Sequence, residues 1–294
     1  MPQSAIIGDL SFHGFYTLGL FYPSAEGQNG CAASRTPMPT DLNCTARERQ
    51  RVLTGEAVST HTNVTVADSI FNRVAKALAH LGAPWSGWLD ATGTPKWEGI
   101  IIAGHSNGAD HAAFLAKTYR VARGLFFSGP NDYVGPNHYG TYSTAAPWQS
   151  AKGATPPTSL FGFGLCGNLP AHGAMPECFD WQPGWAAQGL PSPWLRADGM
   201  LSNVSAMAGY HRICSNGSLV THGNMHMAAA GDCCVPRRPD GRVLWTGIIE
   251  HMLTDKISRP DEAGRLGRLE ERESSLSPCA CAWSKTDADG EGVL

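Results

Sequence analysis

The segment that most constrains the fold of this chain is residues 97–110, WEGIIIAGHSNGAD. An apolar, β-branched run at 100–103 is typical of a buried strand, and it ends at GHSNG, residues 104–108, which has the form G-x-S-x-G. Residues 110–119 contain neither glycine nor proline, so a helix is expected to follow. In this motif a serine occupies a strained turn between a strand and a helix, and the glycines leave room for neighbouring backbone. The sequence therefore predicts a nucleophile elbow with Ser106 at its tip.

A serine hydroxyl attacks a carbonyl carbon well only when a base accepts its proton and a third group orients that base. In the chain order serine, acid, histidine, the histidine follows a late strand. His222 directly follows the apolar segment 218–221, SLVT, and is the expected base, with His226 as the alternative. The backbone N–H of Asn107, at the start of the expected helix, is expected to be one of two donors that stabilise an oxyanion.

The identity of the acid stays open between two carboxylates. Asp180 lies in the segment after the apolar run 159–165, where the chain order places the acid. Asp132 comes soon after another apolar run, 123–129, and is the alternative. An aspartate in a loop is otherwise most often a turn or capping residue.

Short apolar runs that predict strands alternate along the chain with segments of helical periodicity. The predicted strands are 15–23, 100–103, 123–129, 159–165 and 218–221. The predicted helices are 1–14, which ends at Gly14, 65–81, which is capped by Thr65 with Asp68, 110–119 and 245–253. This alternation is typical of an α/β protein with a mostly parallel sheet and helices on both faces. We expect one domain over 1–253 and, over 254–294, a charged and disordered C-terminal tail.

The composition limits which binding partners and which cellular compartment are expected for this chain. The net charge of −3 gives no reason to expect nucleic acid, and no apolar run reaches the roughly 20 residues of a membrane helix. Nine cysteines and four N-x-S/T sites favour a secreted glycoprotein, although the first residues do not resemble a signal peptide. Cys31 and Cys44 are expected to form a disulfide rather than a metal site. The four sites are Asn43, Asn63, Asn203 and Asn216.

With these motifs the chain resembles the α/β-hydrolase superfamily, and in particular a group of secreted-type α/β hydrolases. The resemblance implies a serine hydrolase of the esterase or lipase type. Such an enzyme acts on a small-molecule or lipid-like carboxylic ester through an acyl-enzyme, and it needs neither a metal nor an organic cofactor. The oligomeric state is not implied. Besides the elbow, the shared features are Tyr22-Pro23, the loop from Cys31 to Cys44, Asp68-Ser69-Ile70, Trp97, His111-Ala112-Ala113, Phe127-Ser128-Gly129-Pro130 with Asp132, Ala146-Pro147-Trp148, Phe161-Gly162-Phe163 and His222-Gly223.

Two departures from the group's pattern matter for activity. The group carries an aspartate shortly after the Phe-Gly-Phe strand, where this chain has Asn168, which cannot supply a negative charge. The strands and glycine-rich loop that usually precede Met1–Gly14, and that supply the second oxyanion N–H, are expected to be missing through N-terminal truncation. The alternative function is therefore a catalytically impaired hydrolase-fold protein, kept for binding or produced from an incomplete gene.

Overall fold

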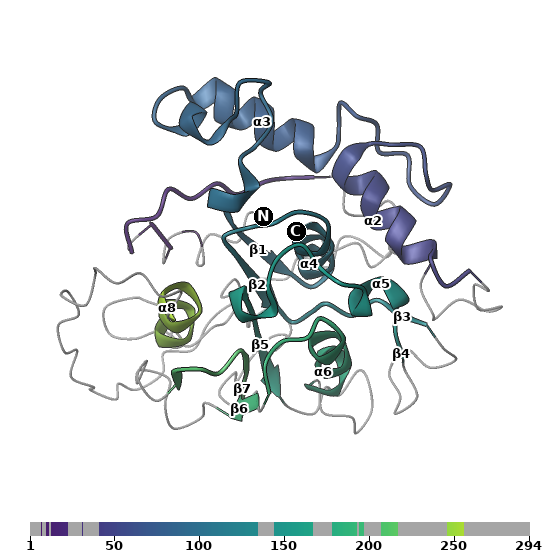
Figure 1. Cartoon of the computed structure of the whole chain (residues 1–294), viewed down its shortest axis with the longest axis vertical. Helices are drawn as coiled ribbons and strands as arrows, with labels where there is room; N and C mark the ends of the chain where they lie inside the picture. The colour runs from purple at the N-terminus through teal and green to yellow at the C-terminus, as the bar shows by residue number, and fades with distance from the viewer. Residues whose placement is uncertain are drawn as a thin grey trace, which may run out of the picture.

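The computed structural model describes residues 7, 10, 11, 13–22, 31, 41–134, 144–166, 178–192, 194–196, 207–216 and 246–255. In this part of the chain a parallel five-stranded sheet is flanked by helices, so the predicted α/β class is confirmed (Figure 1). The strands are β1 (Ile101–His105), β2 (Arg123–Phe127), β3 (Tyr133–Val134), β4 (Thr144–Ala145), β5 (Leu160–Cys166), β6 (Trp194–Arg196) and β7 (Arg212–Asn216). The helices are α2 (Cys44–Thr54), α3 (Ile70–Leu81), α4 (Asn107–Thr118), α5 (Pro147–Ser150), α6 (Cys178–Ala187) and α8 (Thr246–Thr254), with single 3-10 turns η1 (Trp85–Trp88), η2 (Trp97–Gly99) and η3 (Pro157–Ser159). None of the helices described here is long and apolar enough to cross a membrane.

The central sheet has the strand order β1-β2-β5-β7-β6, and every neighbouring pair is parallel. Parallel strands end at the same edge of a sheet, so Ser106 after β1 and Ser128 after β2 lie at one edge, where α/β proteins bind ligands. The predicted strands at 100–103, 123–129 and 159–165 are confirmed as β1, β2 and β5. Strands β6 and β7 were not predicted, and the expected strand 218–221 lies outside the described residues.

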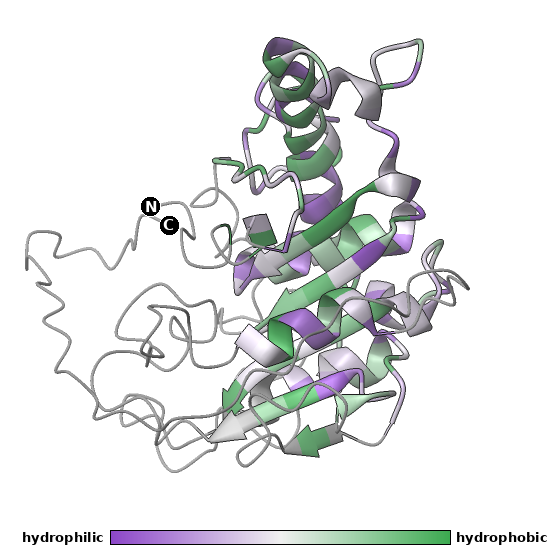
Figure 2. Cartoon of the chain, turned by 90° about the vertical axis from the view of Figure 1, so that its left-hand side faces the viewer, coloured by the Kyte–Doolittle hydropathy of each residue, from purple (hydrophilic) through white to green (hydrophobic). Residues whose placement is uncertain are grey.

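The strands bury opposite faces against different helices, because successive side chains of a strand point to opposite sides. Phe126 belongs to the apolar cluster that includes residues of α4 and α6. Leu125 and Phe127 belong to a second cluster with Ile248 and Met252 of α8. In Figure 1, α8 lies on one side of the sheet and α4, α5 and α6 on the other, and Figure 2 shows hydrophobic residues along the strands between them. The expectation of helices on both faces is therefore confirmed.

Two glycines in β5 make room for helix α6. Phe161, Phe163 and Leu165 face the α8 cluster, so the residues between them face the other side. A Cβ on Gly162 would overlap the indole of Trp185, and one on Gly164 would overlap the indole of Trp181. Both indoles are almost completely buried. The alternating Phe-Gly-Phe-Gly pattern thus places aromatic side chains under α8 and leaves space for two tryptophans on the opposite face.

Helix α3 begins at Ile70 rather than at Thr65, so the predicted capping by Thr65 with Asp68 is wrong. The Thr65 hydroxyl donates to the Asp68 carboxylate at 2.9 Å, while the backbone N–H of Asn72 donates to Ser69 Oγ at 3.3 Å. A serine with extended backbone immediately before the helix is a strong N-cap, and here it satisfies a backbone donor that Thr65 is too far away to reach. The helix therefore starts after Ser69.

The predicted strand over 15–23 is also wrong in its described part, 15–22, which joins no strand. Its aromatic residues instead pack through their rings, Tyr16 against Trp85 at 5.4 Å between centroids and Tyr22 against His111 at 5.1 Å. Aromatic composition favours strands through side-chain packing, and here that packing occurs on other elements. Most of the predicted helix 1–14 lies outside the described residues; at its expected end, Gly14 has a φ of 81° and its N–H bonds to Ser11 O at 3.0 Å.

Helix α2 was not predicted from its polar sequence. Its first residue, Cys44, forms a disulfide with Cys31, as expected. Its last turn closes at Gly55, whose φ of 79° is left-handed and whose N–H bonds to Arg51 O at 2.7 Å. The buried face of α2 carries Val52 and Leu53 together with a charged residue one helical turn earlier, Arg49. This face lies against α4 and brings Arg49 to the elbow.

Candidate active site

Ser106 lies at the turn between β1 and α4, as the elbow prediction requires. Its φ of 54° and ψ of −122° are rare for a residue with a side chain and cost about 1–3 kcal/mol. The strain is maintained by hydrogen bonds on both sides of the turn. The Ser106 N–H donates to Phe127 O of β2 at 2.9 Å, and the Ser106 carbonyl accepts the N–H of Ala109 at 2.8 Å. Ser106 itself is only half-buried, so its side chain lies at the accessible edge of the sheet.

The two glycines of the motif have different surroundings. A Cβ on Gly104 would overlap the carbonyl group of Gly108 and lie 2.7 Å from Ala109 N, so the strand and the first turn of α4 touch through backbone at this point. A Cβ on Gly108 would meet only the Tyr22 hydroxyl, at 3.4 Å. Gly104 is therefore required by the close approach of strand and helix, whereas Gly108 has space beside it.

The loop after β2 closes around the elbow. A Cβ on Gly129 would lie 2.7 Å from Ala109 Cβ and 3.0 Å from Ser106 O, so glycine is needed where this loop crosses the first turn of α4. The Gly129 carbonyl accepts the indole N–H of Trp185 at 2.7 Å, which ties the loop to α6. This explains the sequence Phe127-Ser128-Gly129-Pro130 in terms of packing against the elbow.

A buried ionic cluster lies behind the elbow and is centred on Arg49 of α2. Arg49 Nε donates to Asp132 Oδ2 at 3.1 Å and Nη2 to Asp132 Oδ1 at 2.7 Å, which is a bidentate pair. Arg49 Nη2 also lies 3.3 Å from Asp110 Oδ2, and Nη1 donates to the side-chain oxygen of Asn107. Arg49 Nη1 lies 3.3 Å from His111 Nε2. One guanidinium therefore joins the first and second turns of α4 to the loop after β2.

Burial and charge pairing set the protonation states in this cluster. Burial lowers the pKa of Arg49, but Asp132 and Asp110 outweigh burial, so the pKa is raised and Arg49 stays charged. Burial, followed by the charge of Asp132, raises the pKa of Asp110 to about 8 in spite of Arg49. Burial and the nearby Arg49 lower the pKa of His111 well below its usual value, so His111 is neutral. At neutral pH the guanidinium of Arg49 is thus positive, while Asp110 keeps its proton and His111 is neutral.

The raised pKa of Asp110 predicts a loss of stability as the pH rises. The carboxyl has an ordinary pKa of 3.8 and a folded-state pKa of about 8, so between these values the folded chain holds a proton that the unfolded chain releases. The contribution of this proton to folding stability is complete below the ordinary pKa and is lost as the pH rises through the folded-state pKa. The free energy of unfolding then falls by at most about 1.4 kcal/mol per pH unit. Urea unfolding from pH 4 to 9 should show this slope in the wild type and a weaker one in Asp110→Asn. Equal slopes would contradict the assignment.

The structure describes some of the predicted site residues and not others. Ser106, Asn107 and Asp132 are described in full. Asp180 lies in the first turn of α6, but its side chain is outside the described part, as are His222 and His226 entirely. The structure therefore brings Ser106, Asn107 and Asp132 together at the end of β1 and β2 and leaves the base and Asp180 as predictions.

Asp132 has contacts that a triad acid does not need. Both of its oxygens accept from Arg49, and Oδ2 also accepts from the indole N–H of Trp148 at 3.2 Å. Its backbone oxygen accepts from the side chain of Gln149. These bonds hold the loop after β2 against α2 and α5, which is a structural task that the sequence did not indicate.

Sequence reasoning missed Arg49 as a member of the site. A signal was present, because Cys44, Glu48, Val52 and Leu53 recur at helical spacing and would place Arg49 on the same face. A charged residue within such a stripe needs a buried partner. Which partner it would find, 83 residues further along the chain, was not readable from that spacing.

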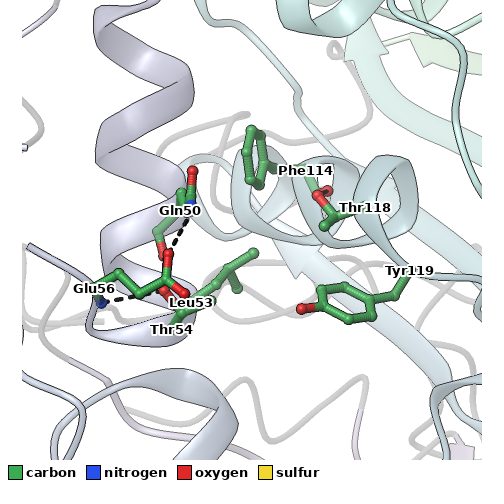
Figure 3. A pocket seen from close by; sticks show the side chains of 7 residues that line it. All are labelled: Gln50, Leu53, Thr54, Glu56, Phe114, Thr118 and Tyr119. Carbon is green, nitrogen blue, oxygen red and sulfur yellow. Dashed lines mark hydrogen bonds between the residues drawn. The ribbon is translucent and has the colours of Figure 1, made fainter. Parts of the chain in front are cut away.

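A small pocket lies at the other end of α4 (Figure 3). It has a volume of about 180 Å³, below the roughly 300 Å³ at which sites for organic ligands begin. Thr118 and Tyr119 line it, about 18 Å along the helix axis from Ser106 at 1.5 Å per residue. On the side of the pocket formed by α2 and the residues after it, Gln50 Nε2 donates to the Glu56 carboxylate at 2.6 Å. This pocket is therefore separate from the elbow.

Within the described ranges, Cys31, Cys44 and His61 are the group whose ligand atoms are suited to a metal ion, all within 4.8 Å of one another. The two sulfurs are bonded to each other, so neither is a thiolate, the form that binds metals. His61 is exposed and offers a single ligand. These three residues fit a disulfide with a neighbouring histidine better than a metal site.

Comparisons with known proteins were made at three levels. No protein-family model, no curated protein and no solved structure matches this chain.

Proposed function

We propose that the chain is a serine hydrolase with an α/β-hydrolase fold that cleaves a carboxylic ester. The observation that carries the proposal is the backbone of Ser106, with a φ of 54° and a ψ of −122°, between a parallel strand and the helix that follows it. Strain of this size at a half-buried serine persists only where the surrounding structure imposes it, and such strain is concentrated at functional sites. Gly104 and Gly129 show how it is imposed here, through close backbone contact on either side.

The proposed reaction needs no group beyond the chain and water. Ser106 Oγ attacks the acyl carbon while His222, or alternatively His226, accepts the hydroxyl proton and then protonates the leaving alcohol. The N–H of Asn107, at the first residue of α4, donates to the oxyanion, and the helix dipole adds to its effect. Water then hydrolyses the acyl-enzyme with the same histidine as base. The substrate is proposed to be a small-molecule or lipid-like ester.

Of the two candidate acids, the proposal favours Asp180. The contacts of Asp132 are with Arg49 and Trp148, and they would be broken if its carboxylate turned to orient a histidine. Asp180 lies on α6, beyond the carboxyl end of β5, which agrees with the chain order serine, acid, histidine. Asp132 then supports the elbow from behind, and Asp180 is the proposed partner of His222.

Two described features support the proposed secretory route. The Cys31–Cys44 disulfide is typical of an oxidising compartment. Of the four glycosylation sites, Asn43 and Asn63 have described side chains, and both residues are exposed. An exposed asparagine is what attachment of a glycan requires.

Covalent labelling tests the proposed function directly. A fluorophosphonate should react with the purified chain, and peptide mass spectrometry should find the adduct on Ser106, because the probe modifies only an activated serine. Ser106→Ala should remain unlabelled, whereas Ser86→Ala, a change at an exposed serine in η1, should label like the wild type. A folded wild type that takes no label would overturn the proposal and favour the catalytically impaired alternative.

A further inference from the structure

Arg49 contacts the residue next to Ser106 in sequence. Arg49 Nη1 donates to the side-chain oxygen of Asn107, which is buried at the first position of α4. The proposed oxyanion donor is the backbone N–H of this same Asn107. Fixing its side chain from behind limits how far the peptide between Ser106 and Asn107 can rotate.

The guanidinium of Arg49 is itself held in place by several partners, so it can restrain the position of Asn107. Asp132 binds it through two bonds, and Asp110 lies 3.3 Å from Nη2. Asp110 Oδ1 also accepts the N–H of Asn131 at 2.7 Å. The loop after β2 and the first turn of α4 are therefore joined directly by this bond as well as through Arg49. The side chains of Arg49, Asp132 and Asp110 are each at most about one-tenth exposed. The position of Arg49 is thus determined by α4 and by the loop after β2 together.

We propose that Arg49 is a positioning residue for the oxyanion site, which holds the Asn107 N–H in place through the Asn107 side chain. The inference rests on the proposed function, since it assigns a purpose to the backbone that would stabilise the oxyanion. Arg49 does not act on substrate itself, because all of its described bonds are to side chains of the cluster.

The geometry requires arginine rather than any cation. Nε and Nη2 face Asp132 while Nη1 faces Asn107, so three nitrogens of one planar group are used in two directions. A lysine ammonium is a single point of charge on a flexible stem and cannot bind Asp132 with two parallel bonds while also reaching Asn107. Arg49→Lys therefore keeps a positive charge beside Asp132 but loses the contact with Asn107.

A second arginine on the same helix provides a matched control. Arg51 is partly buried, and its guanidinium donates to the backbone oxygens of Val64 and Ser59 in the loop before α3. It thus ties α2 to a neighbouring segment without touching the elbow. Arg51→Lys removes a comparable set of bonds from α2. It tests whether any loosening of this helix is enough to raise amide exchange at 104–111 and to lower kcat.

The test compares Arg49→Lys, Arg51→Lys and Asn107→Ala by two measurements. Amide hydrogen exchange of a peptide covering 104–111 should rise several-fold in Arg49→Lys and Asn107→Ala and stay at the wild-type level in Arg51→Lys. For hydrolysis of a p-nitrophenyl ester, Arg49→Lys should lower kcat by about tenfold to a hundredfold with KM within about twofold, as expected for a misplaced group. In the Asn107→Ala background the same change should cost much less, because both act through one contact.

The outcomes separate this inference from the proposed function. Unchanged exchange at 104–111 in Asn107→Ala, which leaves the charges of the cluster intact, would overturn the positioning role even if the chain hydrolyses esters. Fully additive losses in kcat would also overturn it. If the wild type has no Ser106-dependent activity but exchange rises as expected, the proposed function fails while Arg49 still holds the backbone at Asn107.

Discussion

Replacing Ser106 with alanine is expected to lower kcat for p-nitrophenyl ester hydrolysis by about 10⁴-fold or more and to leave the fold unchanged. The loss follows because Oγ is the proposed nucleophile and the base has no other group to activate. Alanine has the same difficulty as serine with a φ of 54°, so the strained turn and its stability are retained. Initial rates at saturating ester and a thermal melt of the same sample measure both parts. Residual activity within tenfold of the wild type would contradict the nucleophile assignment.

Ser106→Gly tests the backbone strain at this position separately from the chemistry of the serine hydroxyl. Glycine adopts a positive φ without a steric penalty, so this variant should be inactive and yet more stable than the wild type by about 1 kcal/mol. Ser106→Ala has no such relief and serves as the control. A Ser106→Gly variant less stable than Ser106→Ala would show that the backbone at this position carries no strain.

Replacing Gly104 with alanine is expected to prevent normal folding of the elbow, at a cost of more than about 3 kcal/mol. The added Cβ would overlap the carbonyl group of Gly108 and approach Ala109 N, and neither can move without separating β1 from α4. Soluble yield, far-UV circular dichroism and urea unfolding measure the effect.

Gly108→Ala is the matched control, and it is expected to fold. Its Cβ would meet only the Tyr22 hydroxyl at 3.4 Å, and alanine is favoured over glycine inside a helix by about 1 kcal/mol. Equal stability of Gly104→Ala and the wild type, or a larger loss at Gly108 than at Gly104, would contradict the described backbone approach.

Several elements could be predicted because their signals are local. The apolar runs predict β1, β2 and β5, the segment 245–253 predicts α8, and the residues around Ser106 predict a strand, a turn and a helix in that order; the structure confirms these elements. The start of α3 was misplaced because Thr65 and Ser69 both qualify as caps and only the fold shows which one meets a free backbone N–H. The aromatic segment 15–22 was misjudged because its rings pack on Trp85 and His111 instead of pairing in the sheet.

The sequence by itself determined the strand, the serine turn and the helix after it. The order of strand, turn and helix depends on contacts within a few residues, such as that between Gly104 and Gly108. The strain at Ser106 also depends on Phe127 and Gly129, which lie further along the chain. The tertiary structure alone decided that Arg49 lies behind this turn and that Asp132 binds it. These residues are 83 positions apart, and Arg49 is 58 positions from Asn107. Ion pairs at such separations depend on which helix faces meet when the core packs, and that is set by the summed burial of many side chains rather than by any one motif.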